Sequence, residues 1–356
     1  MAFIGRPNVG KSTLLNTLLG EKIAIISDKP QTTRTTIMGV KRTDKGEIIF
    51  IDNPGIHRPL HKLNKRMMNL VISSLETADL LCWLIDATQP FGHGDSFVVN
   101  LLEKVNRPLF LLINKVDIIR KDKILPIIDH YKDLLPFKEI IPISALKKIN
   151  LDILEKKIIE YLPETKAKEE KSEETYLSLR FQVAEIVREK LLTQVEKELP
   201  FTTAVFVEKI EDRITGQRLE EINYLSMIKA NKQPPLAEVA GKKGQGADKK
   251  KEKKARPSRL IYINAAIFVE KDNQVGIVVG HRGCRLKTIG REARRELEEL
   301  LKARIYLDLV VKVKEDWRDK ADVLDLIESQ KEIFPHKNSP HSLSLPSSKN
   351  SSSLNS

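Results

Sequence analysis

The chain has 356 residues, 41% of them hydrophobic, and a formal net charge of +12. This length allows about two domains with apolar cores. The charge favours nucleic acid or a membrane surface as partner, although a lysine-rich protein without such a partner has a similar composition. The two cysteines argue against a disulfide framework or a zinc cluster and indicate a reducing compartment. No apolar run approaches the about 20 residues that cross a membrane, and the chain starts directly with an apolar run of strand length, so we expect no signal peptide.

The first motif is a phosphate-binding pattern between an apolar run at residues 1–4 and a helical pattern at residues 12–19. Its glycines let successive backbone N–H groups point at a phosphate chain, and the following helix N-terminus favours anions. Lys11 would reach the outer phosphates and the Ser12 hydroxyl would bind Mg²⁺. A plain Gly-rich turn is the alternative, which four fixed positions in this context disfavour. The predicted nucleotide-binding loop comprises Gly5, Arg6, Pro7, Asn8, Val9, Gly10, Lys11, Ser12 and Thr13.

From residue 1 to about residue 163, short apolar runs alternate with helical patterns, which predicts an α/β domain with a mostly parallel sheet and helices on both faces. The second and third runs are joined by the turn-rich sequence KRTDKG and should form a hairpin. Ligands of such sheets bind at the carboxyl ends of the strands. The expected strands are residues 1–4, 36–40, 47–52, 80–87, 108–114 and 139–144, and the expected helices include residues 12–19, 63–78 and 93–105.

A polar turn with the sequence DNPG follows the third apolar run. Asp52 would hold Mg²⁺, usually through water, and the backbone N–H of Gly55 could bind a terminal phosphate. Asn53 and Pro54 complete the turn. Taken alone, this sequence is equally typical of an ordinary β-turn.

The sequence NKVD, which comprises Asn114, Lys115, Val116 and Asp117, follows the fifth run. Asp117 could accept two hydrogen bonds from the ring N–H and amino group of guanine, a donor pair that adenine lacks. The stem of Lys115 can lie along the base. After the sixth run, the backbone of Ser144 and Ala145 could meet the guanine carbonyl oxygen. Each of these segments could be a plain turn, but their order behind successive strands argues against that reading.

The motifs GRPNVGKS, QTTRT, DNPG, NKVD and ISA together resemble the five nucleotide motifs of translation-factor-like small GTPases. The spelling GRPNVGKSTLLN followed by PQTTRT closely resembles the Era branch. The resemblance implies GTP and GDP as ligands with Mg²⁺, residues 31–35 in switch I, and switch II from Asp52. It implies Thr33 as the Mg²⁺-ligating threonine, with Thr32 and Thr35 as neighbours that could be confused with it.

The same resemblance implies that catalysis rests on Lys11, Thr33 and Gly55, with Mg²⁺ held by Ser12, Thr33 and Asp52. Two positions depart from patterns in related GTPases. Asn53 stands where the family usually has threonine, which leaves the behaviour of switch II open. Ile56 stands where Ras-like GTPases carry a catalytic glutamine. Because isoleucine cannot orient water, we expect slow intrinsic hydrolysis of about 10⁻⁴–10⁻² s⁻¹.

One further cofactor is suggested by the phosphate-binding loop. Asn8 resembles the asparagine that ligates K⁺ in some relatives, so a K⁺ site is a second expectation for this loop.

A charged linker at residues 164–175 separates the first domain from a second one at residues 176–318. A helical pattern with Leu177, Phe181 and Ala184 on one face comes first. Strands are expected near residues 202–210, 259–271 and 304–315, with a basic helix from about residue 284.

The sequence GHRG, which comprises Gly280, His281, Arg282 and Gly283, precedes this basic helix and follows a VV run that we expect to be a strand. The glycines permit close approach of a nucleic-acid strand, and the middle residues offer charge to phosphates. A lone GxxG is a weak signal, and a solvated charged face is the alternative for the helix. The basic residues of that helix are Arg285, Lys287, Arg291, Arg294 and Arg295.

The order helix, strand, strand, GxxG, helix, strand resembles a type II KH domain, and VEKDNQVGIVVGHRG and VKVKEDWR resemble the C-terminal domain of Era. The resemblance implies binding of single-stranded RNA, with His281 as a neutral hydrogen-bond donor and not a catalyst. The implied RNA-binding residues are Gly280, His281, Arg282, Gly283, Arg285 and Lys287.

Two segments depart from this pattern. Residues 213–257 form an insertion that has room for one helix and a Lys- and Gly-rich part that we expect to be disordered. It is either an electrostatic tether to RNA or, as we favour, a tolerated surface insertion. Residues 319–356, which end in a Ser- and Asn-rich stretch, are expected to form a disordered tail.

The resemblance to the Era family implies a monomeric cytoplasmic GTPase that binds the 3′ end of 16S rRNA and assists assembly of the small (30S) ribosomal subunit. A membrane-associated growth regulator with the same GTP switch and peripheral contact to the inner face of the cell membrane is one alternative. An RNA-binding module with little hydrolysis is another. A tRNA-modifying relative would share the first domain, but we find no sign of the further domains that its chemistry needs.

Overall fold

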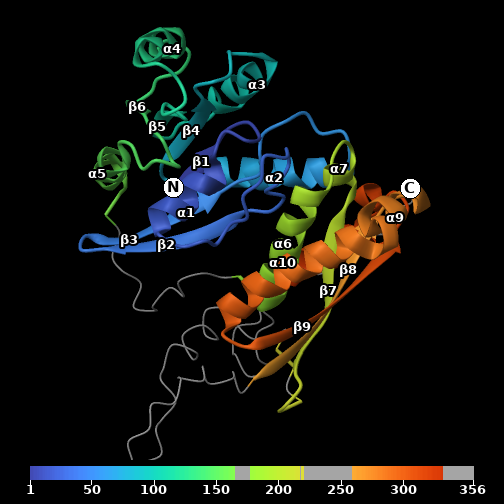
Figure 1. Cartoon of the computed structure of the whole chain (residues 1–356). Helices are drawn as coiled ribbons and strands as arrows, with labels where there is room; N and C mark the ends of the chain where they lie inside the picture. Colours follow the sequence, from blue (N-terminus) through green and yellow to red (C-terminus); the bar gives the residue numbers. More distant parts are fainter. Residues whose placement is uncertain (165–176, 217, 220–258, 332–356) are drawn as a thin grey trace, which may run out of the picture.

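The computed structural model describes residues 1–164, 177–216, 218–219 and 259–331. The expected linker therefore lies, apart from its first residue, outside the described residues, as does most of the expected insertion. Two bodies are visible in Figure 1, an upper one built on a six-stranded sheet and a lower one built on a three-stranded sheet.

The first body has the strand order β2-β3-β1-β4-β5-β6. All neighbouring pairs are parallel except β2 and β3, which form the expected antiparallel hairpin. The mostly parallel sheet is thus confirmed. Its elements are β1 (Ala2–Ile4), α1 (Lys11–Leu19), β2 (Ile37–Thr43), β3 (Gly46–Asp52), α2 (Lys62–Thr77), β4 (Leu81–Asp86), α3 (His93–Leu102), β5 (Leu109–Asn114), α4 (Ile124–Tyr131), β6 (Glu139–Pro142) and α5 (Leu151–Tyr161).

Helices cover both faces of this sheet, as the almost wholly apolar strands require. On one face, Phe3 and Leu112 pack with the buried residues of α1 and α5. On the other face, Trp83 and Ile113 pack with residues of α2, α3 and α4. The carboxyl ends of β1, β3, β4 and β5 consequently meet at one edge of the sheet, where the first-domain motifs begin.

The second body has the strand order β7-β8-β9, with β8 antiparallel to β7 and parallel to β9. Helices α6 and α10 pack on one face of this sheet and enclose its core with Val187, Ile263 and Leu297. This arrangement matches the expected KH order. The elements are α6 (Leu179–Gln194), α7 (Leu199–Thr202), β7 (Ala204–Asp212), β8 (Leu260–Val269), α9 (Asp272–Val279), α10 (Cys284–Leu301) and β9 (Arg304–Val313).

The expected strand before the GHRG sequence is wrong, because Val278 and Val279 end helix α9. A run of a few apolar residues does not distinguish a buried strand from a helix. The helix is selected by Gln274, whose side-chain oxygen accepts hydrogen bonds from the backbone N–H groups of Glu270 and Lys271 at 2.9 and 3.2 Å. The helix ends at Gly280, which has a φ of 74°.

The expectation of disorder from residue 319 onward is also wrong over residues 319–331. This segment contains α11 (Ala321–Glu328), which buries Val323 and Leu324, flanked by short 3₁₀ turns at Trp317–Asp319 and Ser329–Lys331. The side chain of Gln330 is buried and bonds to the backbone of Val205 and Val207 at 3.1 and 2.7 Å. The amphipathic sequence ADVLDLIE escapes notice beside the Ser- and Asn-rich stretch that follows it. Residues 332–356 lie outside the described part.

Helix α11 also joins the two bodies. It packs with Leu63 and Met67 of α2 and with Phe268 of β8 in one small apolar cluster. Polar contacts surround this cluster: Arg66 of α2 pairs with Glu328 at 2.8 Å, and His61 lies 2.8 Å from a carboxylate oxygen of Asp319.

Candidate functional site

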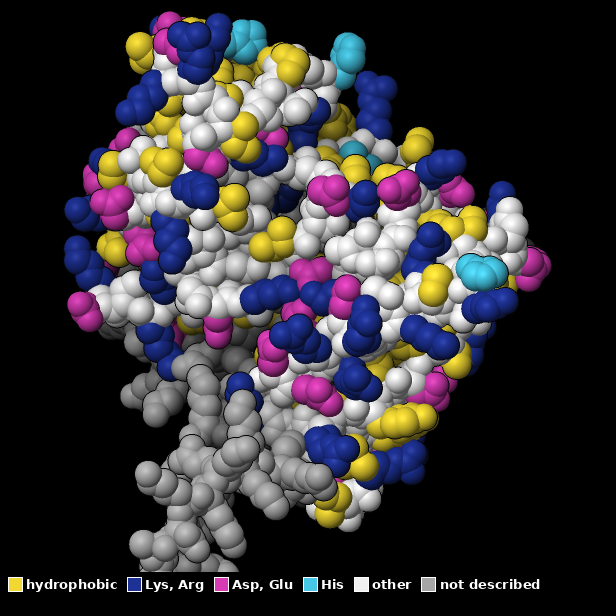
Figure 2. Space-filling view, in the orientation of Figure 1, with side chains coloured by type: hydrophobic (Ala, Val, Ile, Leu, Met, Phe, Trp, Pro, Cys, Tyr) yellow, Lys and Arg dark blue, Asp and Glu magenta, His cyan; other side chains and the backbone are white. Residues whose placement is uncertain are grey.

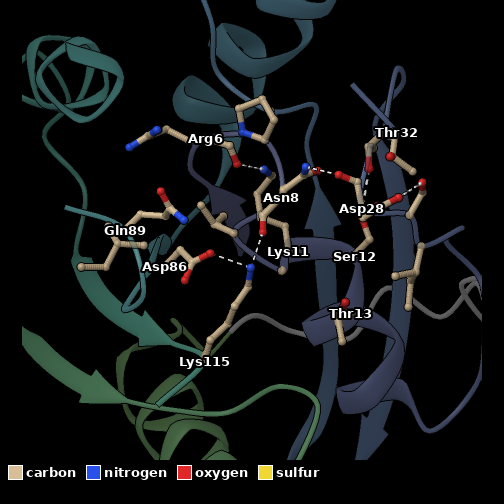
Figure 3. A pocket seen from close by; sticks show the side chains of 18 of the residues that line it. Arg6, Asn8, Lys11, Ser12, Thr13, Asp28, Thr32, Asp86, Gln89 and Lys115 are labelled. Carbon is tan, nitrogen blue, oxygen red and sulfur yellow. Dashed lines mark hydrogen bonds and ion pairs between the residues drawn. The ribbon is translucent and has the colours of Figure 1, made fainter. Parts of the chain in front are cut away.

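A cavity of about 560 Å³ opens at the carboxyl edge of the first sheet. Its lining comes from residues 6–13 of the phosphate-binding loop, residues 25–28 and 31–33 of the following loop, and Gly55 and Lys115. Figure 3 shows the labelled side chains of the loop and of Asp28, Thr32, Asp86, Gln89 and Lys115 around this space. The structure therefore brings segments far apart in the sequence to one place.

The loop has the backbone that only glycine allows at its critical position. Gly10 has a φ of 100°, and a Cβ atom there would lie 2.3 Å from Nδ2 of Asn114. Gly55 meets the loop from the other side, where a Cβ atom would lie 2.7 Å from atoms of Pro7. Both glycines are fixed by close packing, which keeps the backbone N–H groups near the cavity.

Lys11 is nearly enclosed, with 5% of its surface exposed. Its ammonium group donates hydrogen bonds to the carbonyl oxygens of Gly5 and Arg6 at 3.1 and 2.9 Å. Burial lowers the pKa of Lys11 to about 8, although nearby Asp52 opposes this shift. A bound phosphate would stabilise the charged form of Lys11, because it supplies the negative charge that compensates for the burial of the ammonium group.

Three oxygen-bearing side chains meet beside Lys11. The Ser12 hydroxyl lies 2.9 Å from the Thr33 hydroxyl and donates to Oδ2 of Asp52 at 2.6 Å. Burial raises the pKa of the Asp52 carboxyl to about 6, against the lowering effects of Lys11 and of the hydroxyls of Ser12 and Thr33. The buried Oδ1 of Asp52 has no hydrogen-bond partner among the described residues. Hard oxygen ligands and an unpartnered carboxylate oxygen fit Mg²⁺.

Thr33 is distinguished from its two neighbours by this geometry. The hydroxyl of Thr32 donates to the carbonyl oxygen of Lys29 at 2.5 Å. Thr35 lines a different cavity, which lies between the two bodies. Of the three candidate threonines, Thr33 is therefore the one whose hydroxyl contacts Ser12.

Asn114 and Lys115 tie the loops of the site together. The amide of Asn114 donates to the carbonyl oxygen of Val9 at 2.8 Å and accepts from the backbone N–H of Ala145 at 3.0 Å. Lys115 donates to the carbonyl oxygen of Asn8 at 2.9 Å and pairs with Asp86 at 2.6 Å, as Figure 3 shows.

The remaining residues expected to contact the base lie at the edge of this region. Asp117 is exposed on the turn that follows β5, and neither it nor Val116 is among the residues that line the cavity. Ser144 and Ala145 are buried directly after β6, and the hydroxyl of Thr17 in α1 donates to the carbonyl oxygen of Ala145 at 3.1 Å.

Asn53 is turned away from the cavity. It is completely buried, and its amide oxygen accepts from the hydroxyls of Ser74 in α2 and of Thr36 at 2.7 and 3.4 Å. Its amide nitrogen donates to the carbonyl oxygen of Phe3 at 3.3 Å. The neighbouring Pro54 is buried as well. Asn53 therefore links the turn after β3 to β1, to α2 and to Thr36, which directly precedes β2.

Ile56 is 1% exposed, packs into the core beside β1 and does not line the cavity. The next side chain, His57, contacts both the loop that precedes β2 and the first turn of α2. One ring nitrogen lies 2.7 Å from the carbonyl oxygen of Gly55, and the other contacts the side-chain amides of Gln31 and Asn64. His57 belongs to none of the sequence motifs.

Several polar partners of the cavity were also missed. Asp95 holds Arg6 at 2.7 Å while accepting from the N–H of Gly92 at the start of α3. The carbonyl oxygen of Asp28 accepts from the amide of Asn8 at 2.5 Å. Of these residues, only Asp86 has a sequence feature that could have identified it, because it ends an apolar strand just as Asp52 does.

The GHRG loop lies in the second body, between α9 and α10. Gly280, Arg282 and Gly283 have φ angles of 74°, 49° and 75°, and His281 and Arg282 are exposed. Arg285 donates to the carbonyl oxygen of Ile277, so its guanidinium partly closes the turn. Figure 2 shows many Lys and Arg side chains over the face that α10 presents. Those of α10 that are exposed are Lys287, Arg291, Arg294 and Arg295.

No described helix is long and apolar enough to cross a membrane.

Comparisons with known proteins agree with this architecture. Residues 1–115 match a family model described as a 50S ribosome-binding GTPase, and residues 240–318 match a KH domain model. Over 92% of its length the chain is 36% identical to an Era solved with MgGDPNP and nucleotides 1506–1542 of 16S ribosomal RNA, of which 96% is covered, with a TM-score of 0.76. It is also 36% identical to an Aquifex aeolicus Era variant bound to GDP and AlF₄⁻, of which 97% is covered, with a TM-score of 0.75. The chain therefore belongs to the Era family of GTPases.

Proposed function

We propose that this protein is a Mg²⁺-dependent GTP-hydrolysing switch that binds the 3′ end of 16S rRNA through its GHRG loop and assists assembly of the small ribosomal subunit. The observation that carries the proposal is the convergence of Ser12, Thr33 and Asp52 beside Lys11, in a chain whose second body is a KH domain. Similar Era proteins were solved with MgGDPNP and 16S rRNA and with GDP and AlF₄⁻.

In the nucleotide site, Lys11 would hold the outer phosphates and spread their charge, while backbone N–H groups of residues 8–13 would surround the inner phosphates. Ser12, Thr33 and Asp52 would hold Mg²⁺, which neutralises charge that builds up between the outer phosphates. The N–H of Gly55 would meet the terminal phosphate. Asn114 and Lys115 would keep the base pocket joined to the loop, and Asp117 with the backbone of Ser144 and Ala145 would select guanine.

Hydrolysis should be slow without further help, because the buried Ile56 leaves no side chain there to orient water. The oxygen of the Asn8 amide is the atom that would ligate K⁺. Its nitrogen already contacts Asp28, which would hold the amide in a fixed orientation. Replacing K⁺ by Na⁺ during GTP hydrolysis tests this part: a K⁺ site predicts a lower rate in Na⁺, and equal rates would remove it.

The coupling between GTP and RNA would run through switch I, because the KH body contacts three positions in this segment or directly next to it. Arg188 of α6 donates to the carbonyl oxygen of Thr32, and Lys331 donates to that of Thr36 at 2.6 Å. Between these positions, Arg34 donates to the carbonyl oxygens of Pro200 and Thr203, both at 2.7 Å.

These contacts place Thr33 between two gripped neighbours while its hydroxyl lies against Ser12. Loss of the terminal phosphate would release Thr33 and with it the neighbouring contacts to the KH body. Since a similar Era was solved with MgGDPNP and RNA together, we assign the tighter RNA binding to the GTP state.

Phosphate release from GTP with Mg²⁺, with and without 16S rRNA nucleotides 1506–1542, tests the proposal. We expect slow release in both cases and direct binding of this RNA by fluorescence anisotropy. Arg282→Asp should lower the RNA affinity about ten-fold or more, since it turns an attraction to phosphate into a repulsion. Lys121→Asp, which reverses an exposed charge on the first body, is the matched control.

This experiment, together with a binding measurement on vesicles that contain anionic lipid, separates the alternatives. RNA binding with no phosphate release would leave an RNA-binding module without enzymatic activity. Binding to vesicles containing anionic lipid but not to RNA would favour the membrane-associated regulator. Equal RNA affinity of Arg282→Asp and Lys121→Asp would contradict the role of the GHRG loop.

A further inference from the structure

The face of the KH sheet that points away from α6 and α10 carries an unusual set of side chains. Ile261 and Ile263 of β8 point into the core, so Tyr262 and Asn264 point to the opposite face. Toward the α9 end of β8 this second face is covered, because Phe268 packs beneath α11. Toward the beginning of β8 it is open.

An aromatic pair marks the open part. Tyr262 and Tyr306 are register partners on the parallel strands β8 and β9, with ring centroids 5.7 Å apart and an interplanar angle of 20°. The guanidinium of Arg213 lies 4.3 Å from the centre of the Tyr262 ring. Tyr306 is 62% exposed, so most of its surface is left to solvent. Packing against a neighbouring strand accounts for an aromatic side chain at Tyr262, but it does not require an aromatic partner as exposed as Tyr306.

Polar groups beside the rings complete a recognition surface. Oδ2 of Asp308 accepts hydrogen bonds from the hydroxyl of Tyr262 at 3.2 Å and from the amide of Asn264 at 3.1 Å. The rings border a cavity of about 900 Å³ that reaches around strand β9 toward α10. Its charged lining residues are Arg213, Arg294, Glu298, Arg304 and Asp308.

This surface is separate from the GHRG loop. The loop precedes the first residue of α10, whereas the cavity is lined by the second half of α10 and by the residues that follow it. The helix residues that line the cavity, Arg294 and Glu298, lie ten and fourteen residues after Cys284, a rise of about 15–21 Å along the helix axis. An RNA that occupies the loop would therefore need several further nucleotides to reach the rings.

The chain leaves and re-enters the described structure beside this end of the sheet. Residues 219 and 259, which border the undescribed segment 220–258, adjoin this open end of the sheet: Leu219 donates to Ile210, and Arg259 pairs with Asp212 at 2.6 Å. Within that segment, residues 241–258 contain eight Lys or Arg and two acidic residues. Among the described residues, Arg213 and Arg304 bring positive charge beside the exposed ring of Tyr306, which suits a polyanion that has flat bases.

We propose that the surface formed by Tyr262, Tyr306, Arg213 and Asp308 is a second RNA contact that takes unpaired nucleotides beyond those held by the GHRG loop. An unpaired base would stack on Tyr306, and its phosphates would meet Arg213 and Arg304. Asp308 could accept a hydrogen bond from an exocyclic amino group of the base. The proposal rests on the RNA-binding function above and extends it.

The test compares two RNAs on the full-length protein. One is 16S rRNA nucleotides 1506–1542, and the other is only its 3′-terminal segment, too short to reach from the loop to the rings. We expect Tyr306→Ala to lower the affinity for the long RNA about five-fold or more and to leave the affinity for the short RNA unchanged. Tyr306→Phe, which keeps the ring, should behave as the unaltered protein with both RNAs.

Ultraviolet crosslinking of the long RNA, with mass spectrometry of the attached peptide, gives an independent readout. A crosslink at Tyr306 or Tyr262 supports the proposal. Unchanged affinity of Tyr306→Ala for the long RNA overturns it, and this is also the result expected if the face binds a protein instead. Failure of both RNAs to bind the unaltered protein would instead refute the RNA-binding function itself.

Discussion

The phosphate-binding site and the GHRG loop are built in opposite ways. Lys11 and Asp52 are almost fully buried, and each is fixed by partners within a few ångströms. His281 and Arg282 are exposed on a loop shaped by two glycines. The phosphate-binding site therefore depends on individual buried groups, whereas the GHRG loop depends on summed charge and on backbone shape. Single substitutions should therefore have larger effects in the first site.

The largest expected effect comes from Asp117, which is exposed in this structure and would be covered by a bound guanine ring. Asp117→Asn should weaken GTP binding about 10³-fold or more, because the carboxylate that we propose to pair with two donors of guanine is replaced by an amide that offers a donor of its own. Xanthine nucleotides should regain most of the affinity. Competition between GTP and XTP for the variant measures this change, and an unaltered preference for GTP would contradict the role of Asp117.

Lys11→Met should come next, because it removes the buried cation but keeps the length of the side chain. We expect a loss of GTP affinity of about 100-fold, with RNA affinity of the nucleotide-free protein unchanged. Titration with a fluorescent GTP analogue provides the measurement. Lys65→Met, an exposed lysine of α2, is the control and should bind GTP normally. Equal affinities of the two variants would count against a buried phosphate contact.

The pH dependence of nucleotide affinity sharpens the same point with a smaller effect. Burial raises the pKa of Asp52 to about 6 and lowers that of Lys11 to about 8 in the free protein. Binding of Mg²⁺ and phosphate favours the charged form of both groups. Affinity should therefore be greatest between about pH 6 and pH 8, falling below this range as Asp52 gains a proton and above it as Lys11 loses one. A flat affinity from pH 5 to pH 9 by isothermal titration would contradict it.

The smallest effect concerns the buried asparagine behind the site. Asn53→Ala should lower the free energy of unfolding by about 1–3 kcal/mol, because the completely buried amide loses its hydrogen bonds with the hydroxyl of Ser74 and the carbonyl oxygen of Phe3. Asn53→Thr, which restores the residue usual in the family, should lose less. Urea unfolding of the three proteins measures the difference, and identical midpoints would show that the link made by Asn53 is not stabilising.

The parts that could be predicted from the sequence are those with local patterns. The parallel strands of the first body are nearly continuous apolar runs, and the phosphate-binding loop has its fixed spacing within residues 5–13. The VV run before the GHRG loop was wrongly predicted to be a strand, because the helix that it ends depends on the cap made by Gln274. Helix α11 was missed because its stabilising partners, such as Phe268, lie far away in the sequence.

The contacts between the two bodies had no sequence signal at all. Arg188 and Thr32 are separated by 156 residues, and Lys331 and Thr36 by 295 residues. The spacing of Arg and Lys along the sequence does not show which of them donates a hydrogen bond to a distant carbonyl oxygen and which lies on a solvated face. Only the folded arrangement brings these cations to switch I. The proposed account, in which the KH body senses the bound nucleotide through switch I, depends on them.

That account is tested most directly by measuring RNA affinity in the GTP-analogue and GDP states for the unaltered protein and for Arg188→Gln. The unaltered protein should bind 16S rRNA nucleotides 1506–1542 about five-fold or more tightly with the GTP analogue. In Arg188→Gln, which removes the charged donor to Thr32, this ratio should fall toward one while GTP still binds. An undiminished ratio in Arg188→Gln would contradict the claim that the KH body senses the nucleotide through switch I.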